Sequence, residues 1–117
     1  MKKRPLAVVV VAVLLMLTGA GGLFVDFQHF QPVSADHYAI VWMVSVHALA
    51  IVAGIFLLRG SNWARWLAIA WMAFHVVISF WNPWQQLAMH GMILALFVWI
   101  LFRQDARAFF RPAQASA

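Results

Sequence analysis

The chain of 117 residues contains no cysteine and no glutamate, and its only acidic residues are three aspartates, Asp26, Asp36 and Asp105. Without cysteine, the protein cannot form a disulfide, bind a metal through thiolates or attack a substrate with a thiol. Only 9% of the residues are charged, whereas 66% are hydrophobic. A soluble domain of this length needs far more charge to cover its surface, so the composition predicts a membrane protein.

The basic residues alternate along the chain. All eight lysines and arginines lie at every second boundary of the hydrophobic runs: Lys2, Lys3, Arg4, Arg59, Arg65, Arg103, Arg107 and Arg111. The intervening boundaries, 26–37 and 82–84, contain no basic residue. Because basic residues flank the cytoplasmic ends of membrane helices, this alternation predicts four spans with both termini in the cytoplasm. The basic flanks are expected to contact anionic lipid headgroups, and their juxtamembrane position argues against nucleic-acid binding.

The hydrophobic runs predict an all-α, four-helix transmembrane bundle with up-down-up-down connectivity, forming a single domain over 1–111. The expected helices cover about residues 5–25, 38–58, 63–81 and 84–110, and a disordered tail is expected over 112–117. Four spans of about 20 residues use most of the chain, which leaves no room for a separate soluble domain.

Residues at the expected helix ends are typical caps. Asp36 suits the N-cap of the second helix, because its carboxylate can accept hydrogen bonds from the free N–H groups there. Gly60 suits the left-handed position that follows the same helix. Asn82 and Pro83 suit the N-cap and the first position of the fourth helix.

The first hydrophobic run also has features of a secretory signal peptide. A basic start is followed by apolar residues 6–17 and by the small residues 18–20. Cleavage there would leave three spans and an external N-terminus. Because apolar residues continue over 21–27, beyond the usual length of a signal peptide, we expect this run to remain as a span.

Three histidines, His47, His75 and His90, fall inside the expected spans. At a rise of about 1.5 Å per residue from the outer boundary, all three lie in the outer half, within about 5 Å of one another in depth. Ionisable residues inside spans are uncommon, and each is a candidate functional residue. The three histidines are therefore the candidate cofactor-binding residues, although no metal is specified by their spacing.

Residues three or four positions from each histidine lie on the same helix face and form with it a stripe of small or polar residues. The first span has a similar stripe. The stripes are Thr18, Gly22 and Asp26; Met43, His47, Ala50 and Gly54; Ala68, Met72, His75 and Ser79; and Gln86, His90 and Leu94. If they face inward, the bundle encloses a polar pocket that opens outward. Asp26, His29, Asp36 and His37 are then expected as solvated residues above its mouth.

Several chemistries fit such a pocket. Haem b could take two imidazoles as axial ligands, with Gly22 or Gly54 leaving room for the macrocycle. A transition metal could use the three imidazoles, joined by Met43 or Met72 if it were copper. A quinone site or proton path could use the proton exchange of histidine. The structural alternative is that the histidines only form hydrogen bonds between membrane helices.

These observations support three functional hypotheses. The first is a non-enzymatic accessory or structural membrane component, acting as a homo-oligomer or within a membrane complex, because no catalytic motif is evident. The second is a haem or metal protein of membrane electron transfer that uses His47, His75 and His90. The third is an oligomeric transporter or channel.

The segment LLRGSNWARW at 57–66, together with ARAFFR at 106–111, resembles a recurring type of small four-span bacterial inner-membrane protein. This resemblance extends over most of the chain in layout and implies a bacterial cytoplasmic (inner) membrane location, but no activity. Other four-span families are excluded by missing residues. Small multidrug-resistance transporters need a carboxylate within the first span, vitamin K epoxide reductase-like proteins need cysteines, and MAPEG proteins carry a Glu-Arg pair in a span.

Overall fold

The computed structural model describes residues 4–29 and 36–111, and every regular element in this part of the chain is an α-helix. The helices are α1 (Leu6–Gln28), α2 (His37–Leu58), α3 (Asn62–Ser79), α4 (Trp84–Leu101) and α5 (Gln104–Phe110). The all-α prediction is therefore confirmed for the described residues. The tail expected to be disordered, 112–117, lies outside them.

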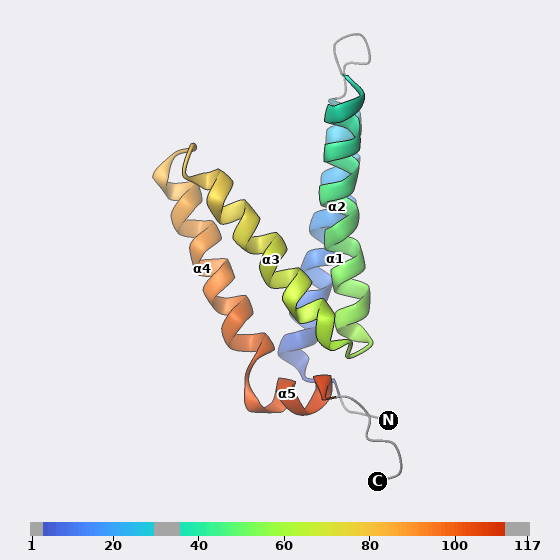
Figure 1. Cartoon of the computed structure of the whole chain (residues 1–117), viewed down its shortest axis with the longest axis vertical. Coiled ribbons are helices and arrows are strands. Elements are labelled where there is room, and N and C mark those ends of the chain that lie inside the picture. The colour runs from blue at the N-terminus through green and yellow to red at the C-terminus, as the bar shows by residue number, and fades with distance from the viewer. Residues whose placement is uncertain (1–3, 30–35, 112–117) are drawn as a thin grey trace.

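The helices form two hairpins that diverge at one end (Figure 1). α1 packs against α2, and α3 packs against α4, while α2 and α3 join the two pairs. The hairpins separate toward the turn between α3 and α4, and α5 lies across the opposite end (Figure 1). We call these two ends the turn end and the α5 end.

Three helices, α1, α2 and α4, are long and apolar enough to cross a membrane. α3 falls below this level, because its 18 residues include Asn62, Arg65 and His75. Large apolar side chains are exposed on the outside of the long helices, as at Leu14 and Val41. Such surfaces suit contact with lipid rather than with water, so the fold indicates a membrane protein.

Two predicted caps of α2 are confirmed. The Asp36 carboxylate accepts a hydrogen bond of 2.7 Å from the backbone N–H of Ala39, which satisfies a free donor in the first turn. After the last turn, Gly60 takes a φ of 77°, and its N–H donates to the Leu57 carbonyl at 3.0 Å. Only glycine adopts this left-handed conformation without strain, so residue 60 ends the helix and turns the chain toward α3.

α4 begins at residue 84, as expected, but the predicted roles of Asn82 as N-cap and Pro83 as first helical residue were wrong. Pro83 takes the N-cap position and the helix begins at Trp84. The side-chain amide of Asn82 donates to the Ile78 carbonyl at 3.0 Å instead of capping α4. The Asn82 side chain thus bonds a carbonyl in the last turn of α3, which also accepts from the Trp81 N–H, rather than the start of α4.

The helix expected over 84–110 is broken. α4 ends at Leu101, and a separate helix begins at Gln104 after two residues that leave helical geometry. The break lets α5 turn across the bundle, where Phe109 and Phe110 are only 5% and 1% exposed. A straight continuation would have carried both rings away from the core, so burial of these aromatic residues favours the break.

Arg65 of α3 stabilises this break. Its Nη1 donates to the Leu101 carbonyl at 3.0 Å, which satisfies a free acceptor at the end of α4. Its guanidinium carbon lies 4.4 Å from the ring centroid of Phe102 and 5.0 Å from that of Phe110. One side chain thus joins α3, α4 and α5 through a hydrogen bond and two cation–π contacts.

The buried core lies mainly in the half of the molecule near α5, and small residues let α1 and α2 approach closely. The buried hydrophobic residues are Val8, Val11, Ala12, Leu15, Ala50, Ala53, Leu57, Ala64, Ala68, Trp71, Met72, Phe97, Leu101, Ala106, Phe109 and Phe110. A Cβ on Gly54 would lie 2.7 Å from the carbonyl oxygen of Ala12, and one on Gly19 would lie 2.6 Å from that of His47. Such close approach is typical of packing between membrane helices.

Candidate functional site

All three histidines of the predicted site line one cavity of about 430 Å³ among α1, α2, α3 and α4. Thr18 and the histidines form its part nearer the turn end. The rest of the lining, toward α5, is apolar and includes Val10, Leu14, Leu15, Ile93, Leu96 and Phe97. The volume falls within the usual range for small-molecule pockets, about 300–1,000 Å³. The cavity therefore has one polar end and a longer apolar body.

This cavity differs from the polar, outward-opening pocket that the sequence predicted. Asp26, His29, Asp36 and His37 are not among its lining residues. Asp36 caps α2, and the His29 Nδ1 donates to the Val25 carbonyl of its own helix at 2.9 Å. Asp36 and His29 thus satisfy local backbone groups at the helix ends.

The cavity opens sideways, between α1 and α4. Three of its lining residues are about half exposed: Val10 at 46%, Leu14 at 51% and Leu96 at 47%. α1 and α4 touch each other at few places, so these two helices leave a gap between these side chains. In a membrane this side faces the lipid hydrocarbon, which gives an apolar molecule a direct path into the cavity.

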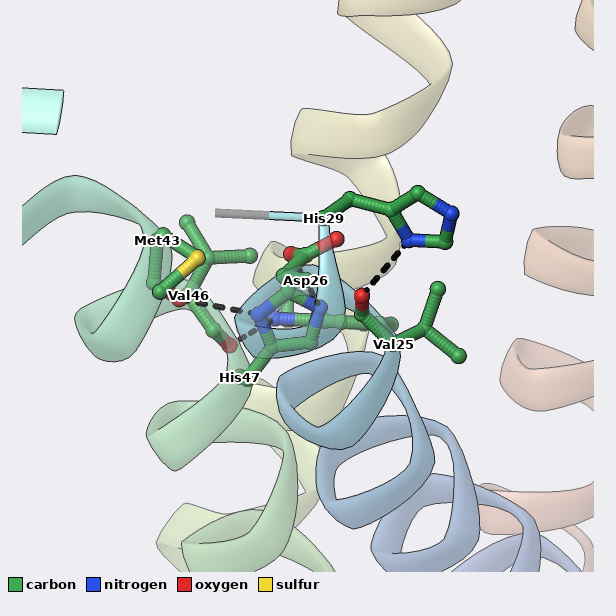
Figure 2. A network of polar contacts seen from close by, with 7 residues as sticks. Val25, Asp26, His29, Met43, Val46 and His47 are labelled. Atoms are coloured by element: carbon green, nitrogen blue, oxygen red, sulfur yellow. Dashed lines mark hydrogen bonds and ion pairs between the residues drawn. The ribbon is translucent and has the colours of Figure 1, made fainter. Parts of the chain in front are cut away.

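His47 on α2 is held by α1 and by its own helix (Figure 2). Its Nδ1 lies 2.8 Å from the Met43 carbonyl oxygen. Because a carbonyl can only accept, Nδ1 carries a hydrogen. The other ring nitrogen, Nε2, lies 3.7 Å from the Asp26 carboxylate of α1. Gly22 makes room for this pair, since a Cβ at that position would overlap the imidazole ring.

His75 on α3 is oriented by Trp71. The His75 Nδ1 donates to the Trp71 carbonyl at 2.8 Å, and the centroids of the two rings lie 4.0 Å apart. The Trp71 indole N–H in turn donates to the Val46 carbonyl of α2 at 2.8 Å. The residue that positions this imidazole is therefore itself fixed to the neighbouring helix.

His90 on α4 is oriented by Ser79 of α3. The Ser79 Oγ lies 2.7 Å from the His75 carbonyl oxygen and 2.6 Å from the His90 Nδ1. A hydroxyl has one hydrogen, and the carbonyl can only accept it, so Ser79 accepts a hydrogen bond from the Nδ1–H of His90. The centroids of the His75 and His90 rings lie 5.9 Å apart. Ser79 thus joins the two histidines across the α3–α4 interface.

The three imidazoles consequently carry their hydrogen on the same atom, Nδ1. In the neutral form, the Nε2 atom of each ring then has a free lone pair. Among the described residues, Nε2 of His75 and Nε2 of His90 form no hydrogen bond. Every fully buried side-chain nitrogen or oxygen in this part of the chain does have a hydrogen-bond partner. These two Nε2 atoms are therefore not fully buried, and both residues line the cavity.

The described residues do not form a three-imidazole metal site. They contain no group of three or more histidine, cysteine or acidic residues arranged to hold a metal ion. His47 pairs with Asp26, which leaves His75 and His90 as the close pair. A haem between those two rings would have to part α3 from α4 at the hydrogen bond made by Ser79.

Sequence reasoning placed Asp26 in the stripe of the first span with Thr18 and Gly22, but also counted it among the solvated residues above the pocket. The structure instead extends α1 to Gln28, so Asp26 lies on the helix and faces His47. The spacing of Gly22 and Asp26, four residues apart, supported the first placement, because it puts a gap and a carboxylate on one helix face.

Comparison with protein-family models, with curated protein sequences and with solved structures finds no match for this chain. A candidate function must therefore come from the cavity, its opening and the chemistry of the residues that line it.

Proposed function

We propose that this chain is a non-enzymatic, integral protein of the bacterial inner membrane that binds a small, largely apolar molecule in the histidine-lined cavity. It crosses the membrane four times, with both termini in the cytoplasm, and acts as an accessory component of a membrane process. The observation that carries the proposal is the meeting of all three span histidines at one end of an apolar cavity. Its sideways opening favours a ligand that dissolves in the bilayer.

The proposed four spans include α3, although its hydropathy is lower than that of the other long helices. Its 18 residues reach about 27 Å, close to the hydrocarbon thickness of about 30 Å. It packs against α4, which is apolar enough to cross. Arg65 lies at its α5 end, together with Arg107 of α5 and the flanking Arg103 and Arg111, while the turn to α4 has no basic residue. This placement supports a crossing that begins in the cytoplasm.

The ligand site is tested with a fluorinated naphthol and the full-length protein in lipid nanodiscs. Fluorine NMR should detect a bound signal that empty nanodiscs lack. Leu96→Trp fills the cavity from a half-exposed position and should abolish this signal. Val98→Trp, on the same helix but outside the cavity lining, is the matched control and should retain it. Equal signals from protein-loaded and empty nanodiscs would refute the proposed site.

A second candidate, metal binding for electron transfer, is favoured by one observation. Histidines that bind metals commonly donate their other ring N–H to an oxygen acceptor, as His75 and His90 do. Metal analysis and visible absorption of the purified protein separate the two candidates. Copper, zinc or haem retained by the wild type but lost from His75→Phe would favour this second function.

A further inference from the structure

We infer that the molecule held in the cavity carries a hydroxyl group, which donates a hydrogen bond to Nε2 of His75 or His90. This inference rests on the proposed ligand-binding function and narrows the chemical class of the ligand to an alcohol or phenol with an apolar body. It follows from which ring nitrogen carries hydrogen, and from where the two imidazoles lie in the cavity.

The first step concerns the direction of the hydrogen bond. The Nδ1–H of His75 donates to the Trp71 carbonyl, and that of His90 donates to Ser79. In the neutral form of these rings, which an apolar membrane cavity favours, Nε2 has no hydrogen. Each Nε2 can therefore accept a hydrogen bond but cannot donate one. A ligand carbonyl, which only accepts, finds no donor on either Nε2.

The second step concerns the other polar groups near the cavity. Nε2 of His47 faces the Asp26 carboxylate at 3.7 Å, so this nitrogen already has a charged neighbour. Thr18, which also lines the cavity, lies on the exposed face of α1. The acceptors available to a ligand in the interior are thus those of His75 and His90, whose rings lie side by side.

The third step concerns the shape and polarity of the ligand. The histidines occupy one end of the cavity, and the remaining lining toward α5 is apolar, with Leu14, Leu15 and Phe97 among its members. This arrangement fits a molecule with a hydroxyl at one end and a hydrocarbon or aromatic body. Ammonium or carboxylate groups do not fit, because no lysine, arginine or aspartate of the described residues lines the cavity to act as a counter-ion.

The test compares two ligands of the same shape, a fluorinated naphthol and the corresponding fluorinated methylnaphthalene. Both are titrated into the wild type in nanodiscs and followed by fluorine NMR. The naphthol should bind about twofold to tenfold more tightly, the range expected for one hydrogen bond. His90→Phe or His75→Phe should reduce this preference. His29→Phe, at an exposed histidine that also donates to a carbonyl four residues earlier, is the control and should preserve it.

The possible outcomes separate this inference from the proposed function. Equal affinity of the wild type for both ligands overturns the hydroxyl inference and leaves the ligand site intact. Binding of neither ligand overturns both. A preference that survives both histidine substitutions also overturns the inference, because another group must then accept the hydrogen bond.

A second measurement needs no substitution at the site. Nitrogen NMR of isotopically labelled histidine distinguishes a protonated ring nitrogen from an unprotonated one. In the wild type, His75 and His90 should each show a protonated Nδ1 and an unprotonated Nε2. Adding the naphthol, but not the methylnaphthalene, should shift the Nε2 signals. A protonated Nε2 on both rings would contradict the inference, whatever the substituted proteins do.

Discussion

The side chain of His47 occupies a space that exists because residue 22 has no Cβ. The glycine lies on α1 and the histidine on α2, so one missing methyl group decides whether the two helices can close around the imidazole. The Asp26 carboxylate, one turn further along α1, faces the same ring. Gly22 is therefore a packing residue whose substitution should affect the site directly.

Gly22→Ala should destabilise the protein by about 1–3 kcal/mol, as expected when a methyl group is forced into a filled space. Gly21→Ala is a closely matched control, because a Cβ at that neighbouring position meets nothing within 4 Å. It should change the free energy of unfolding by less than about 1 kcal/mol. Denaturant titration of both variants in detergent measures the difference. Equal stability of the two variants would show that α1 and α2 do not close around His47 as described.

The sequence was sufficient to identify the histidines but not the orientation of their rings. Their types and helical spacing predicted that His47, His75 and His90 lie at similar depth, and the structure brings all three to one cavity. Which ring nitrogen of His90 carries the proton, by contrast, depends on its hydrogen bond with Ser79 of another helix. Such a contact depends on how α3 and α4 are rotated against each other, and single-helix periodicity does not contain that information.

At the scale of the elements, the α5 end depends on one arginine. Arg65 satisfies a carboxyl-terminal carbonyl of α4 and covers two aromatic rings beyond it. A lysine would keep the positive charge required for topology, but its single ammonium cannot span these groups as a planar guanidinium does. Substitution by lysine therefore isolates the geometry of the side chain from its charge.

Arg65→Lys should lower the free energy of unfolding by about 1–3 kcal/mol, with loosening of the segment between α4 and α5. Arg59→Lys is the control. Its guanidinium lies 5.3 Å from one ring centroid, that of Phe56, and its loss should change stability by less than about 0.5 kcal/mol. Denaturant titration and hydrogen exchange at Phe102 measure the two effects. If the two substitutions had equal effects, Arg65 would not join the helices as we describe.

The boundaries of the long helices were predictable within a few residues, because capping residues and hydrophobic runs are local features. Asp36 and Gly60 act as the sequence indicated. The break after Leu101 was not predictable, because it depends on Arg65, which lies 36 positions earlier and contacts the chain only after folding. The helix expected over 84–110 was reasonable on local grounds and was overridden by tertiary contacts.

At the scale of the whole molecule, two hairpins meet near α5 and diverge toward the turn end (Figure 1). The core fills the region where they meet, while the cavity lies along α1 and α4 and reaches the histidines. This arrangement places the polar end of the cavity inside the bilayer only if α3 crosses the membrane alongside α4. The orientation of α3 therefore decides both the topology and the surroundings of the site.

The absence of cysteine makes this orientation directly measurable, because a single introduced cysteine is the only thiol in the chain. Asn82→Cys places it in the turn between α3 and α4, Ser61→Cys before α3, and Gln104→Cys after α4. In intact bacteria, a membrane-impermeant maleimide should label the first variant alone, and the other two only after the membrane is permeabilised. Labelling of Asn82→Cys and Ser61→Cys from the same side would contradict the four-span protein, because α3 would then not cross the membrane.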